Sequence, residues 1–315
     1  MKISVLDKCS LGDDLPFEIL SKYGDVDIHE STSTAQLQER IKASDVVIIN
    51  KIKITEELLR DKGRLALVCV FATGFDNVDL NAARKYGVAV CNVPSYSTNS
   101  VVLFTLSTVL ALSSKLLDYT QFVKSGAYSG SNAPNKITPV FNEISGKTWG
   151  IIGYGNIGRA VGEVARSLGA NVLVCKRTAT HDIETVDVDT LCEKSDIITI
   201  HCPLTEQTRK LINKDRIARM KKGAILVNEA RGAVLDEEAV TQAVLKGEIG
   251  AFGCDVYSSE PFGIDHPYNK ILHLNNVVLT PHAAWAAYEA RMRCLNIISD
   301  NIASFIRGDR LNRVD

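Results

Sequence analysis

The sequence has almost no net charge, because 36 Lys and Arg residues are balanced by 37 Asp and Glu residues, leaving −1 over 315 residues. No strong field is therefore available to draw nucleic acid or an anionic membrane to the whole surface. Long hydrophobic runs are also missing: the most apolar stretch, VVLFTLSTVLAL, contains Thr and Ser and is shorter than the roughly 20 residues that span a bilayer. We expect a small-molecule partner, and neither nucleic acid nor a membrane.

The eight cysteines are scattered singly, and no two have the CxxC spacing of a zinc site or a redox pair. Most lie in apolar runs such as LALVCVFA, where a reduced cysteine packs like a small hydrophobic side chain. The N-terminal stretch MKISVLDKCSLGDD lacks an apolar segment of the roughly 7–15 residues found in signal peptides. We expect no metal, no disulfide and a cytoplasmic protein.

Two series of strands and helices indicate an α/β protein. The chain exceeds the size at which one hydrophobic core keeps growing, so two domains are expected. In the first third, β-branched runs such as DVVIIN alternate with helical segments such as LQERIK, which is the rhythm of a parallel, flavodoxin-like sheet. Residues 99–123 then have the pattern of one long helix, and an irregular loop rich in Ser, Gly, Asn and Pro follows.

The second series begins near Thr148 and contains continuously apolar strands. Such strands suit a parallel sheet that is covered on both faces, so both predicted domains are doubly wound. The last segment is one amphipathic helix. The strands of the second series are TWGIIGYG, NVLVCKR, DIITIHCP, AILVNEA, GAFGCDV and NVVLTPH, and the final helix is AAYEARMRCLNIISDNIASFIRG.

A GxGxxG turn directly follows the strand WGII and opens the helix RAVGEVARSL. In this Rossmann context Gly153 permits a tight turn, Gly155 lets backbone amides approach a pyrophosphate at the helix N-terminus, and Gly158 allows close packing of helix and strand. A glycine-rich turn that binds nothing is the alternative. The candidate dinucleotide-binding residues here are Gly153, Tyr154, Gly155, Asn156, Ile157 and Gly158.

The residues that follow the second strand of this series are Lys176, Arg177 and Thr178. NAD-specific sites usually carry an Asp or Glu roughly 20 residues after the glycines, to bind the adenosine ribose. Lys and Arg can instead neutralise a ribose 2′-phosphate, and Thr can donate a hydrogen bond to it. We therefore expect NADP(H) in preference to NAD(H). In the alternative, the two cations only solvate the strand end and other residues select the cofactor.

Three ionisable residues follow later strands: Arg231 in VNEARGAVLDE, Glu260 in CDVYSSEPFG and His282 in VVLTPHAAWA. Singly, they could be a surface charge, a turn residue and a core histidine. Together they supply what hydride transfer between a hydroxyl and a carbonyl carbon requires. A guanidinium can hold a substrate carboxylate, an imidazole can exchange a proton near neutral pH, and a carboxylate can fix the imidazole tautomer. We assign these roles to Arg231, His282 and Glu260 in turn.

These motifs, in this order, make the chain resemble the D-isomer-specific 2-hydroxyacid dehydrogenases over nearly its whole length. The matching stretches are GYGNIG, DIITIHCPLTEQTRKLI, KKGAILVNEARGAVLDEEAV, GCDVYSSEP and LTPHAAWA. The resemblance implies that Arg231, Glu260 and His282 are catalytic and that Asp255 binds the nicotinamide carboxamide. It also implies cofactor contacts at Cys202, Pro203, Thr208 and Ala230.

The resemblance further implies a discontinuous substrate domain, residues 1–98 and 284–315, around a dinucleotide-binding domain, residues 99–283. In the first, FATGFDNVDL resembles a loop whose backbone amides at Ala72, Thr73 and Gly74 hold the substrate carboxylate. Lys51 is a weaker candidate for attracting the substrate, since a solvated Lys is an equally good interpretation. A homodimer is expected through the helix that begins near Asn99 and the loop after it, and burial of this apolar helix inside one subunit is an equally good interpretation.

Within the family, the VPSYST loop, Trp285 and EARMRCLNIISDNI look most like glycerate dehydrogenases, also called hydroxypyruvate reductases. We therefore expect reduction of hydroxypyruvate or glyoxylate. The alternatives are a nicotinamide-sensing regulator on the same fold, or another branch such as formate, phosphoglycerate or D-lactate dehydrogenase. Leu103, Phe104 and Glu229 depart from the usual family pattern, which puts the size and polarity of the substrate in doubt.

Overall fold

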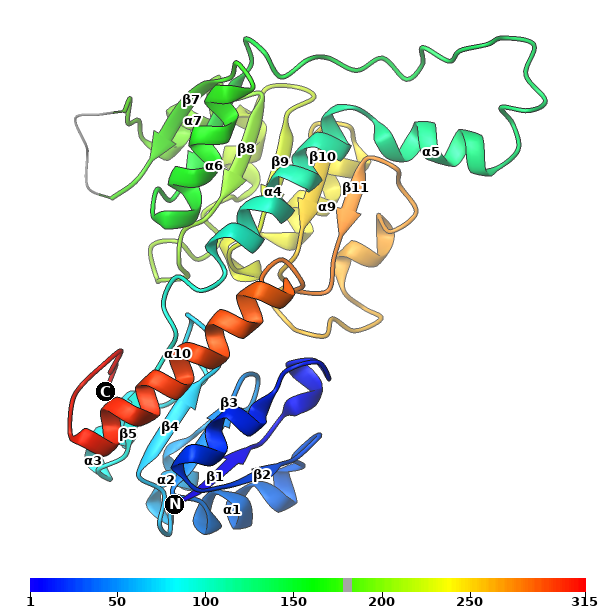
Figure 1. The fold of residues 1–315 in the computed structure, drawn as a ribbon. Coiled ribbons are helices and arrows are strands. Elements are labelled where there is room, and N and C mark those ends of the chain that lie inside the picture. Colours follow the sequence, from blue (N-terminus) through cyan, green and yellow to red (C-terminus); the bar gives the residue numbers. More distant parts are fainter. Residues whose placement is uncertain (178–182) are drawn as a thin grey trace. The chain divides into compact units, whose positions relative to one another are not determined.

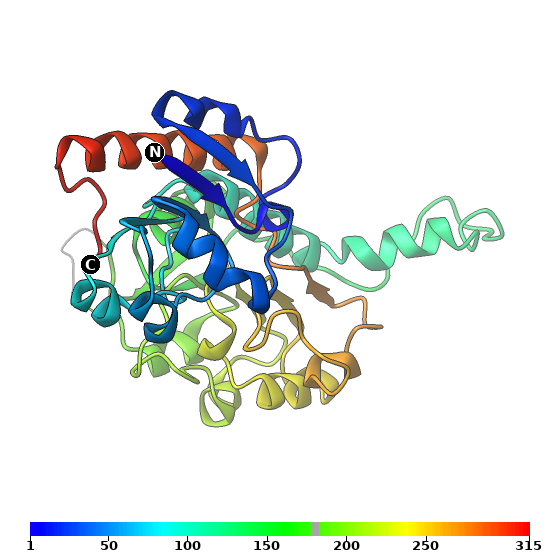
Figure 2. The same ribbon diagram turned by 90° about the horizontal axis from the view of Figure 1, so that it is seen from below.

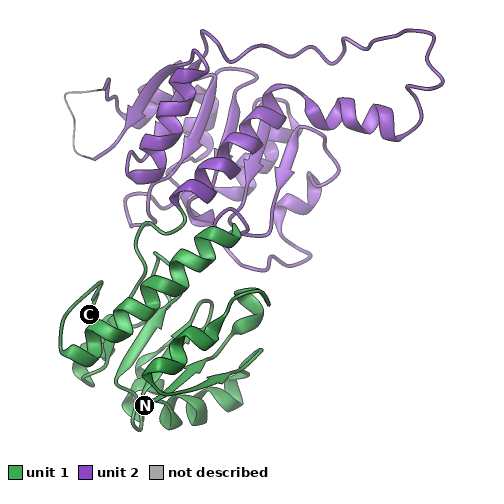
Figure 3. Ribbon diagram, in the orientation of Figure 1, with its two compact units in different colours: residues 1–97, 286–315 green, residues 98–285 purple. Residues whose placement is uncertain are grey.

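The computed structural model describes residues 1–177 and 183–315. The chain divides into two compact units (Figure 3), one made of residues 1–97 and 286–315 and the other of residues 98–285. Each unit has its own parallel sheet and its own hydrophobic core. The predicted α/β class, with two parallel-sheet domains, is confirmed.

The first unit contains a five-stranded parallel sheet in the order β2-β1-β3-β4-β5, which is the flavodoxin-like order. Its central strands are apolar throughout and buried on both faces, because helices cover them. The strands are β1 (Lys2–Val5), β2 (Asp25–Ile28), β3 (Val46–Ile49), β4 (Leu67–Val70) and β5 (Ala89–Cys91).

The last helix, α10 (Tyr288–Arg307), returns to this first unit and packs on β4 and on the 3-10 segment Phe17–Tyr23. Its buried stripe includes Ala290, Cys294 and Ile298, at helical spacing. The shorter helices of the unit are α1 (Thr34–Ala43), α2 (Glu56–Arg60) and α3 (Leu80–Lys85), and a further 3-10 turn spans Lys8–Ser10.

The second unit holds, among the described residues, a six-stranded parallel sheet in the order β11-β10-β9-β8-β6-β7 (Figure 1). The strand order reverses between β6 and β8, and ligands of doubly wound sheets bind beside the carboxyl ends of the strands at such a point. The strands are β6 (Thr148–Ile152), β7 (Asn171–Cys175), β8 (Ile197–Ile200), β9 (Ile225–Asn228), β10 (Ala251–Cys254) and β11 (Val277–Leu279).

Helices cover both faces of this sheet, so it is doubly wound. On one face, Val109 of α4 and Val161 of α6 join a core around Trp149. On the other, Ile217 of α8 and Val240 of α9 join a second core. The helices are α4 (Thr98–Ser113), α5 (Leu116–Lys124), α6 (Asn156–Ser167), α7 (Val188–Lys194), α8 (Lys214–Arg219) and α9 (Glu237–Leu245), with 3-10 turns at Gly232–Val234 and Pro267–Lys270.

The prediction of a single long helix over residues 99–123 was wrong, because α4 and α5 are separate helices that meet at an angle of 69°. Lys115 lies between them with φ +55°, a left-handed backbone conformation that a right-handed helix cannot contain. Beyond this break, α5 and the irregular segment after it extend away from the sheet of the second unit, as Figures 1 and 2 show.

Among the residues that the structure describes, no single helix is long and apolar enough to cross a membrane. By length and composition alone, α4 and α5 would meet that criterion only when they are taken together as a bent pair.

Candidate active site

The carboxyl ends of the strands in the second unit are aligned by their register. Ile152 of β6 pairs with Ile200 of β8, which is level with Asn228 of β9 and Cys254 of β10. The residues that follow these positions therefore emerge at one edge of the sheet. The predicted site residues that follow them are Gly153, Cys202, Pro203, Ala230, Arg231 and Asp255.

The glycine turn is tightly packed on one side and open on the other. Gly153 has φ +92°, and a Cβ there would lie 2.6 Å from the backbone nitrogen of Cys202. A Cβ on Gly158 would lie 2.1 Å from the carbonyl oxygen of Gly153. A Cβ on Gly155, at the N-cap of α6, would meet no atom within 4 Å. The helix N-terminus is thus open to a ligand, and a helix N-terminus favours anions such as a pyrophosphate.

The other residues of the fingerprint support this turn. Asn156 and Ile157 form the first turn of α6. The ring of Tyr154 lies beside Gly162, and the Tyr154 hydroxyl accepts a hydrogen bond from Nη2 of Arg166 over 3.4 Å. A glycine at 162 leaves room for this ring, since a Cβ there would be 3.2 Å from Tyr154 Cε2.

The candidate 2′-phosphate residues follow β7, the strand next to β6. Lys176 is half-buried and Arg177 is exposed. Thr178 lies outside the described residues. Both cations therefore stand at the carboxyl edge, one strand away from the glycine turn.

The loop after β8 is held by its own threonines. The hydroxyl of Thr208 donates to the carbonyl oxygen of Pro203 over 2.7 Å and accepts from the backbone N–H of Thr205 over 2.7 Å. Cys202 is buried, and Pro203 is exposed at the start of the loop. These bonds fix the segment that contains three of the predicted cofactor contacts.

His282 and Glu260 are hydrogen-bonded, as the sequence predicted. Oε2 of Glu260 lies 2.6 Å from Nδ1 of His282, and Oε1 accepts from the backbone N–H of Tyr257 over 3.1 Å. Their side chains are 26% and 28% exposed, so the pair is accessible from solvent. A carboxylate on Nδ1 fixes the tautomer and the orientation of the ring, which leaves Nε2 as the atom for proton exchange.

Asp255 has a structural role that motif spacing did not reveal. Its carboxylate accepts from the hydroxyl of Thr280 over 2.6 Å and from the backbone N–H groups of Ala283 and Ala284 over 2.8 and 2.9 Å. Burial raises the pKa of this carboxyl, and the three hydrogen bonds oppose that shift. Asp255 thereby fixes the backbone on both sides of His282.

Arg231 is positioned by hydrogen bonds to its backbone and by the close packing of two backbone segments. Asn228 donates from Nδ2 to the carbonyl oxygen of Arg231 over 3.0 Å and accepts from the N–H of Ala230 over 3.1 Å. A Cβ at Gly232 would lie 2.0 Å from the carbonyl carbon of Tyr257. Only glycine fits there, and the segment carrying Arg231 therefore lies against the loop that carries Glu260. Sequence reasoning identified neither Asn228 nor this use of Gly232.

The candidate substrate residues Lys51 and Ala72–Gly74 belong to the first unit, where they follow β3 and β4. The buried carboxylate of Asp7 accepts from the backbone N–H of Lys51 over 2.7 Å. Thr73 donates its hydroxyl to the carbonyl oxygen of Val93 over 2.8 Å, and Asn92 donates to the carbonyl oxygen of Thr73 over 2.7 Å. Both loops are therefore held in defined conformations. Asp7 and Asn92 were not predicted.

Two further ionisable groups at the carboxyl edge are neutral near neutral pH. Burial and the neighbouring Asp255 raise the pKa of Glu229 to about 9, and burial lowers the pKa of His201 to about 3. This shift favours the neutral form of Glu229, which lowers the cost of burying a carboxyl beside Asp255. His201 cannot take up a proton at that pH, so the accessible His282 is the better candidate for proton exchange.

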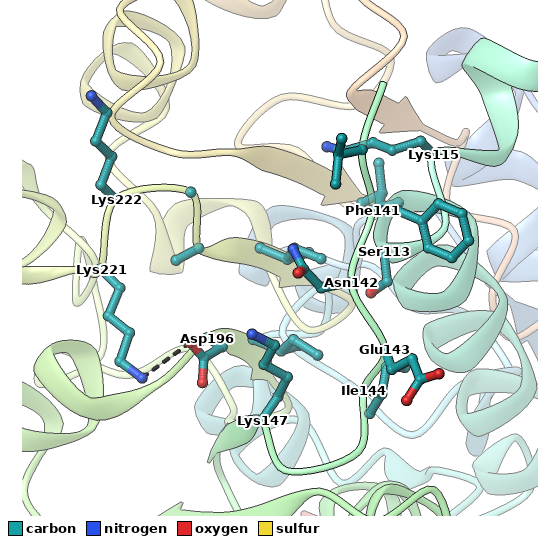
Figure 4. A pocket seen from close by; sticks show the side chains of 16 residues that line it. Ser113, Lys115, Phe141, Asn142, Glu143, Ile144, Lys147, Asp196, Lys221 and Lys222 are labelled. Atoms are coloured by element: carbon teal, nitrogen blue, oxygen red, sulfur yellow. Dashed lines mark ion pairs between the residues drawn. The ribbon is translucent and has the colours of Figure 1, made fainter. Parts of the chain in front are cut away.

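A separate pocket of about 250 Å³ lies at the opposite, amino edge of the sheet (Figure 4). Lys147 and Lys221 line it close to Asp196, which forms an ion pair with Lys221 at 3.1 Å. None of the predicted site residues lines this pocket. Among the described residues, no group of three or more His, Cys, Asp or Glu side chains could hold a metal ion.

A doubly wound sheet with an open glycine turn and an imidazole–carboxylate pair at the same edge defines a dinucleotide-binding oxidoreductase. Comparison with known proteins agrees. A sequence model described as "D-isomer specific 2-hydroxyacid dehydrogenase, NAD binding domain" matches residues 106–284. The hydroxypyruvate reductase of Blautia hydrogenotrophica is 35% identical over 324 residues, covering 100% of both chains.

The glycerate dehydrogenase of Methylorubrum extorquens is 35% identical over 288 residues, covering 91% of each chain. A solved structure, an acyclic imino acid reductase (Bsp5) in complex with NADPH and D-Arg, superposes with a TM-score of 0.89 at 29% identity, covering 100% of both chains. The chain belongs to the D-isomer-specific 2-hydroxyacid dehydrogenases. It is an oxidoreductase that uses a nicotinamide dinucleotide to reduce small keto acids.

Proposed function

We propose that this enzyme reduces hydroxypyruvate or glyoxylate with NADPH, and oxidises the corresponding D-hydroxy acid in reverse. The observation that carries the proposal is the 2.6 Å hydrogen bond between His282 and Glu260 at the carboxyl edge of the second unit. The relatives named hydroxypyruvate reductase and glycerate dehydrogenase support the choice of substrate.

The residues present fit a dinucleotide. Gly155 leaves the N-terminus of α6 open for a pyrophosphate, and Asp255 and Ala230 lie at the neighbouring strand ends for the nicotinamide. Cys202, Pro203 and Thr208 belong to the loop after β8, the strand between β6 and β9. When bound, the reduced cofactor supplies the hydride.

We assign the following tasks to the chain's own residues. The guanidinium of Arg231 holds the substrate carboxylate and polarises the keto oxygen. His282 donates a proton from Nε2 to that oxygen, and Glu260 keeps the ring in the required tautomer and orientation. In the first unit, considered by itself, the backbone amides of Ala72, Thr73 and Gly74 are the candidate anion-binding groups, and Lys51 is a candidate for attracting an anion.

Initial rates with NADPH and NADH test the function and the cofactor choice together. We expect NADPH to give the higher kcat/KM with hydroxypyruvate and glyoxylate, and pyruvate and longer 2-keto acids to react more slowly. Arg177→Asp should reverse the cofactor preference by about tenfold or more, because a carboxylate repels a 2′-phosphate and can accept a ribose hydroxyl. Lys246→Asp, at the exposed end of α9, makes the same change of charge and should leave the preference unchanged.

Equal rates with both cofactors, and no response to Arg177→Asp, would remove the NADPH proposal and leave the reductase. Binding of a nucleotide without turnover of any keto acid would instead favour a nicotinamide-sensing regulator.

We further propose a homodimer that uses α4, α5 and the segment 125–144. This region exposes apolar side chains that a monomer would leave in water, a pattern that marks protein interfaces. The most exposed are Leu103, Leu116, Val123, Ile137, Val140 and Phe141.

Light scattering on the wild-type chain should give about twice the 34.4 kDa mass of one subunit. Ile137→Asp with Val140→Asp should give monomers, because the substituted side chains are 78% and 73% exposed and would place charge in an apolar interface. Leu272→Asp, an exposed position outside this region, is the control. A monomeric wild type, or a dimer that survives the double substitution, contradicts the proposed interface.

We propose the cytoplasm as the compartment. All eight cysteines are free thiols, and a reducing compartment maintains that state.

A further inference from the structure

The first turn of α9 contains a nearly buried carboxylate that the proposed chemistry does not use. The Glu237 side chain is only 10% exposed, and Oε1 accepts from the backbone N–H of Ser258 over 2.9 Å. Oε2 accepts from the hydroxyl of Ser258 and lies 3.1 Å from Nε2 of His266. Removing a carboxylate from water is costly unless hydrogen bonds replace the lost solvent. We therefore expect the Glu237 carboxylate to hold its partners, Ser258 and His266, firmly in place.

The segment that Glu237 binds is the loop that carries Glu260. Ser258 is two residues before Glu260 and His266 is six residues after it, so both ends of the loop are attached to one carboxylate. Next to Ser258, Tyr257 donates its N–H to Oε1 of Glu260 over 3.1 Å. A displacement of Ser258 would therefore be passed directly to Glu260.

The same loop is also connected to the strand end that carries His282. The hydroxyl of Tyr257 donates to the carbonyl oxygen of Thr280 over 2.7 Å, two residues before His282. The Tyr257 ring lies edge-on to the rings of Phe262 and His266, with centroids 4.7 and 6.1 Å away. Glu237 thus stands at one end of a continuous set of contacts whose other end is the Glu260–His282 pair.

We propose that Glu237 is a positioning residue for proton transfer: by holding Ser258 and His266 it keeps Glu260 within hydrogen-bonding distance of Nδ1 of His282. The inference rests on the proposed function of His282 and Glu260. Glu237 contacts neither substrate nor cofactor in this assignment, and it acts through the loop alone.

The neighbouring Glu238 provides a matched control. It lies in the same turn of α9, but it is exposed, and its carboxylate binds Gln242 over 2.9 Å and Lys270 over 3.3 Å instead of the loop. Glu237→Gln and Glu238→Gln therefore remove the same charge from the same helix end. Only the first removes an anchor of the Glu260 loop.

We expect Glu237→Gln to lower kcat for keto acid reduction by about tenfold to a hundredfold, since small displacements of catalytic groups have effects of that order. The dissociation constant of the dinucleotide should stay within about twofold, because the glycine turn is untouched. The KM for the keto acid should stay within about twofold, so that kcat and kcat/KM fall together, because Glu260 orients the proton donor and Arg231 binds the carboxylate. Glu238→Gln should match the wild type in all three measurements.

His266→Gln, which keeps a hydrogen-bonding side chain in place of the imidazole, gives a second and milder variant if Glu237→Gln does not fold. It should lower kcat by a smaller factor and leave the KM for the keto acid unchanged within about twofold. The inference is overturned if Glu237→Gln and His266→Gln keep the wild-type kcat. An inactive wild type would contradict the proposed function instead, so the two failures are distinguishable.

Discussion

Replacing His282 with Gln is expected to lower kcat for keto acid reduction by about 10³-fold, within the range that general acid catalysis contributes. Gln fills a similar volume and can still bond to Glu260, but it cannot donate a proton to the keto oxygen. The dinucleotide should bind with an affinity within about twofold of the wild type, because the open N-terminus of α6 and the residues after β7 are unchanged.

Stopped-flow rates and fluorescence titration with NADPH measure the two quantities separately. The exposed His273, substituted by Gln, is the control for loss of an imidazole and should retain full activity. In the wild type, Nε2 donates a proton during reduction and accepts one during oxidation, so the substitution should slow both directions. A His282→Gln enzyme with near-wild-type kcat would assign proton transfer to another group.

Much of the fold could be predicted from the sequence because its signals are local. β3 and β4 read VVII and LVCV, and only a strand covered on both faces is apolar at every position. The break between α4 and α5 could not be predicted in this way. It depends on the left-handed backbone of Lys115, a residue type that gives no local sign of such a conformation.

Part of the candidate site could also be predicted from the sequence, and part could not. Arg231, Glu260 and His282 each follow a predicted strand, so their common edge follows from parallel topology. The contacts that hold them do not. Gly232 lies against Tyr257, and Glu237 binds His266 from 29 residues away. Neither contact produces a periodic pattern in the sequence, because each depends on how two segments that are distant in the sequence pack in three dimensions.

Glu229 is a residue whose presence was noted in the sequence but whose charge state could not be predicted from it. Its departure from the family pattern was visible in the sequence, but its charge state was not. That state depends on burial beside Asp255, which raises the pKa of Glu229 to about 9. A residue that looks acidic in the sequence is thus shifted by its surroundings toward the neutral form.

Arg231→Lys is expected to lower kcat/KM for hydroxypyruvate by about 10²–10³-fold, comparable to removing one donor that stabilises a transition state. Lys keeps the positive charge, so the loss isolates the planar, two-pronged geometry with which a guanidinium binds a carboxylate. The main chain at this position should be retained, because Asn228 binds the carbonyl oxygen of residue 231 and not its side chain.

Steady-state kinetics with hydroxypyruvate and dinucleotide titration make the comparison, with Arg219→Lys as the control. Arg219 is exposed at the end of α8 and pairs with Glu193 at 2.8 Å, and its substitution should change neither quantity. Because Arg231 is assigned to both substrate binding and polarisation of the keto oxygen, KM should rise and kcat should fall together. A rise in KM alone would mean that the guanidinium binds the carboxylate equally well before and during hydride transfer, and takes no part in polarising the carbonyl.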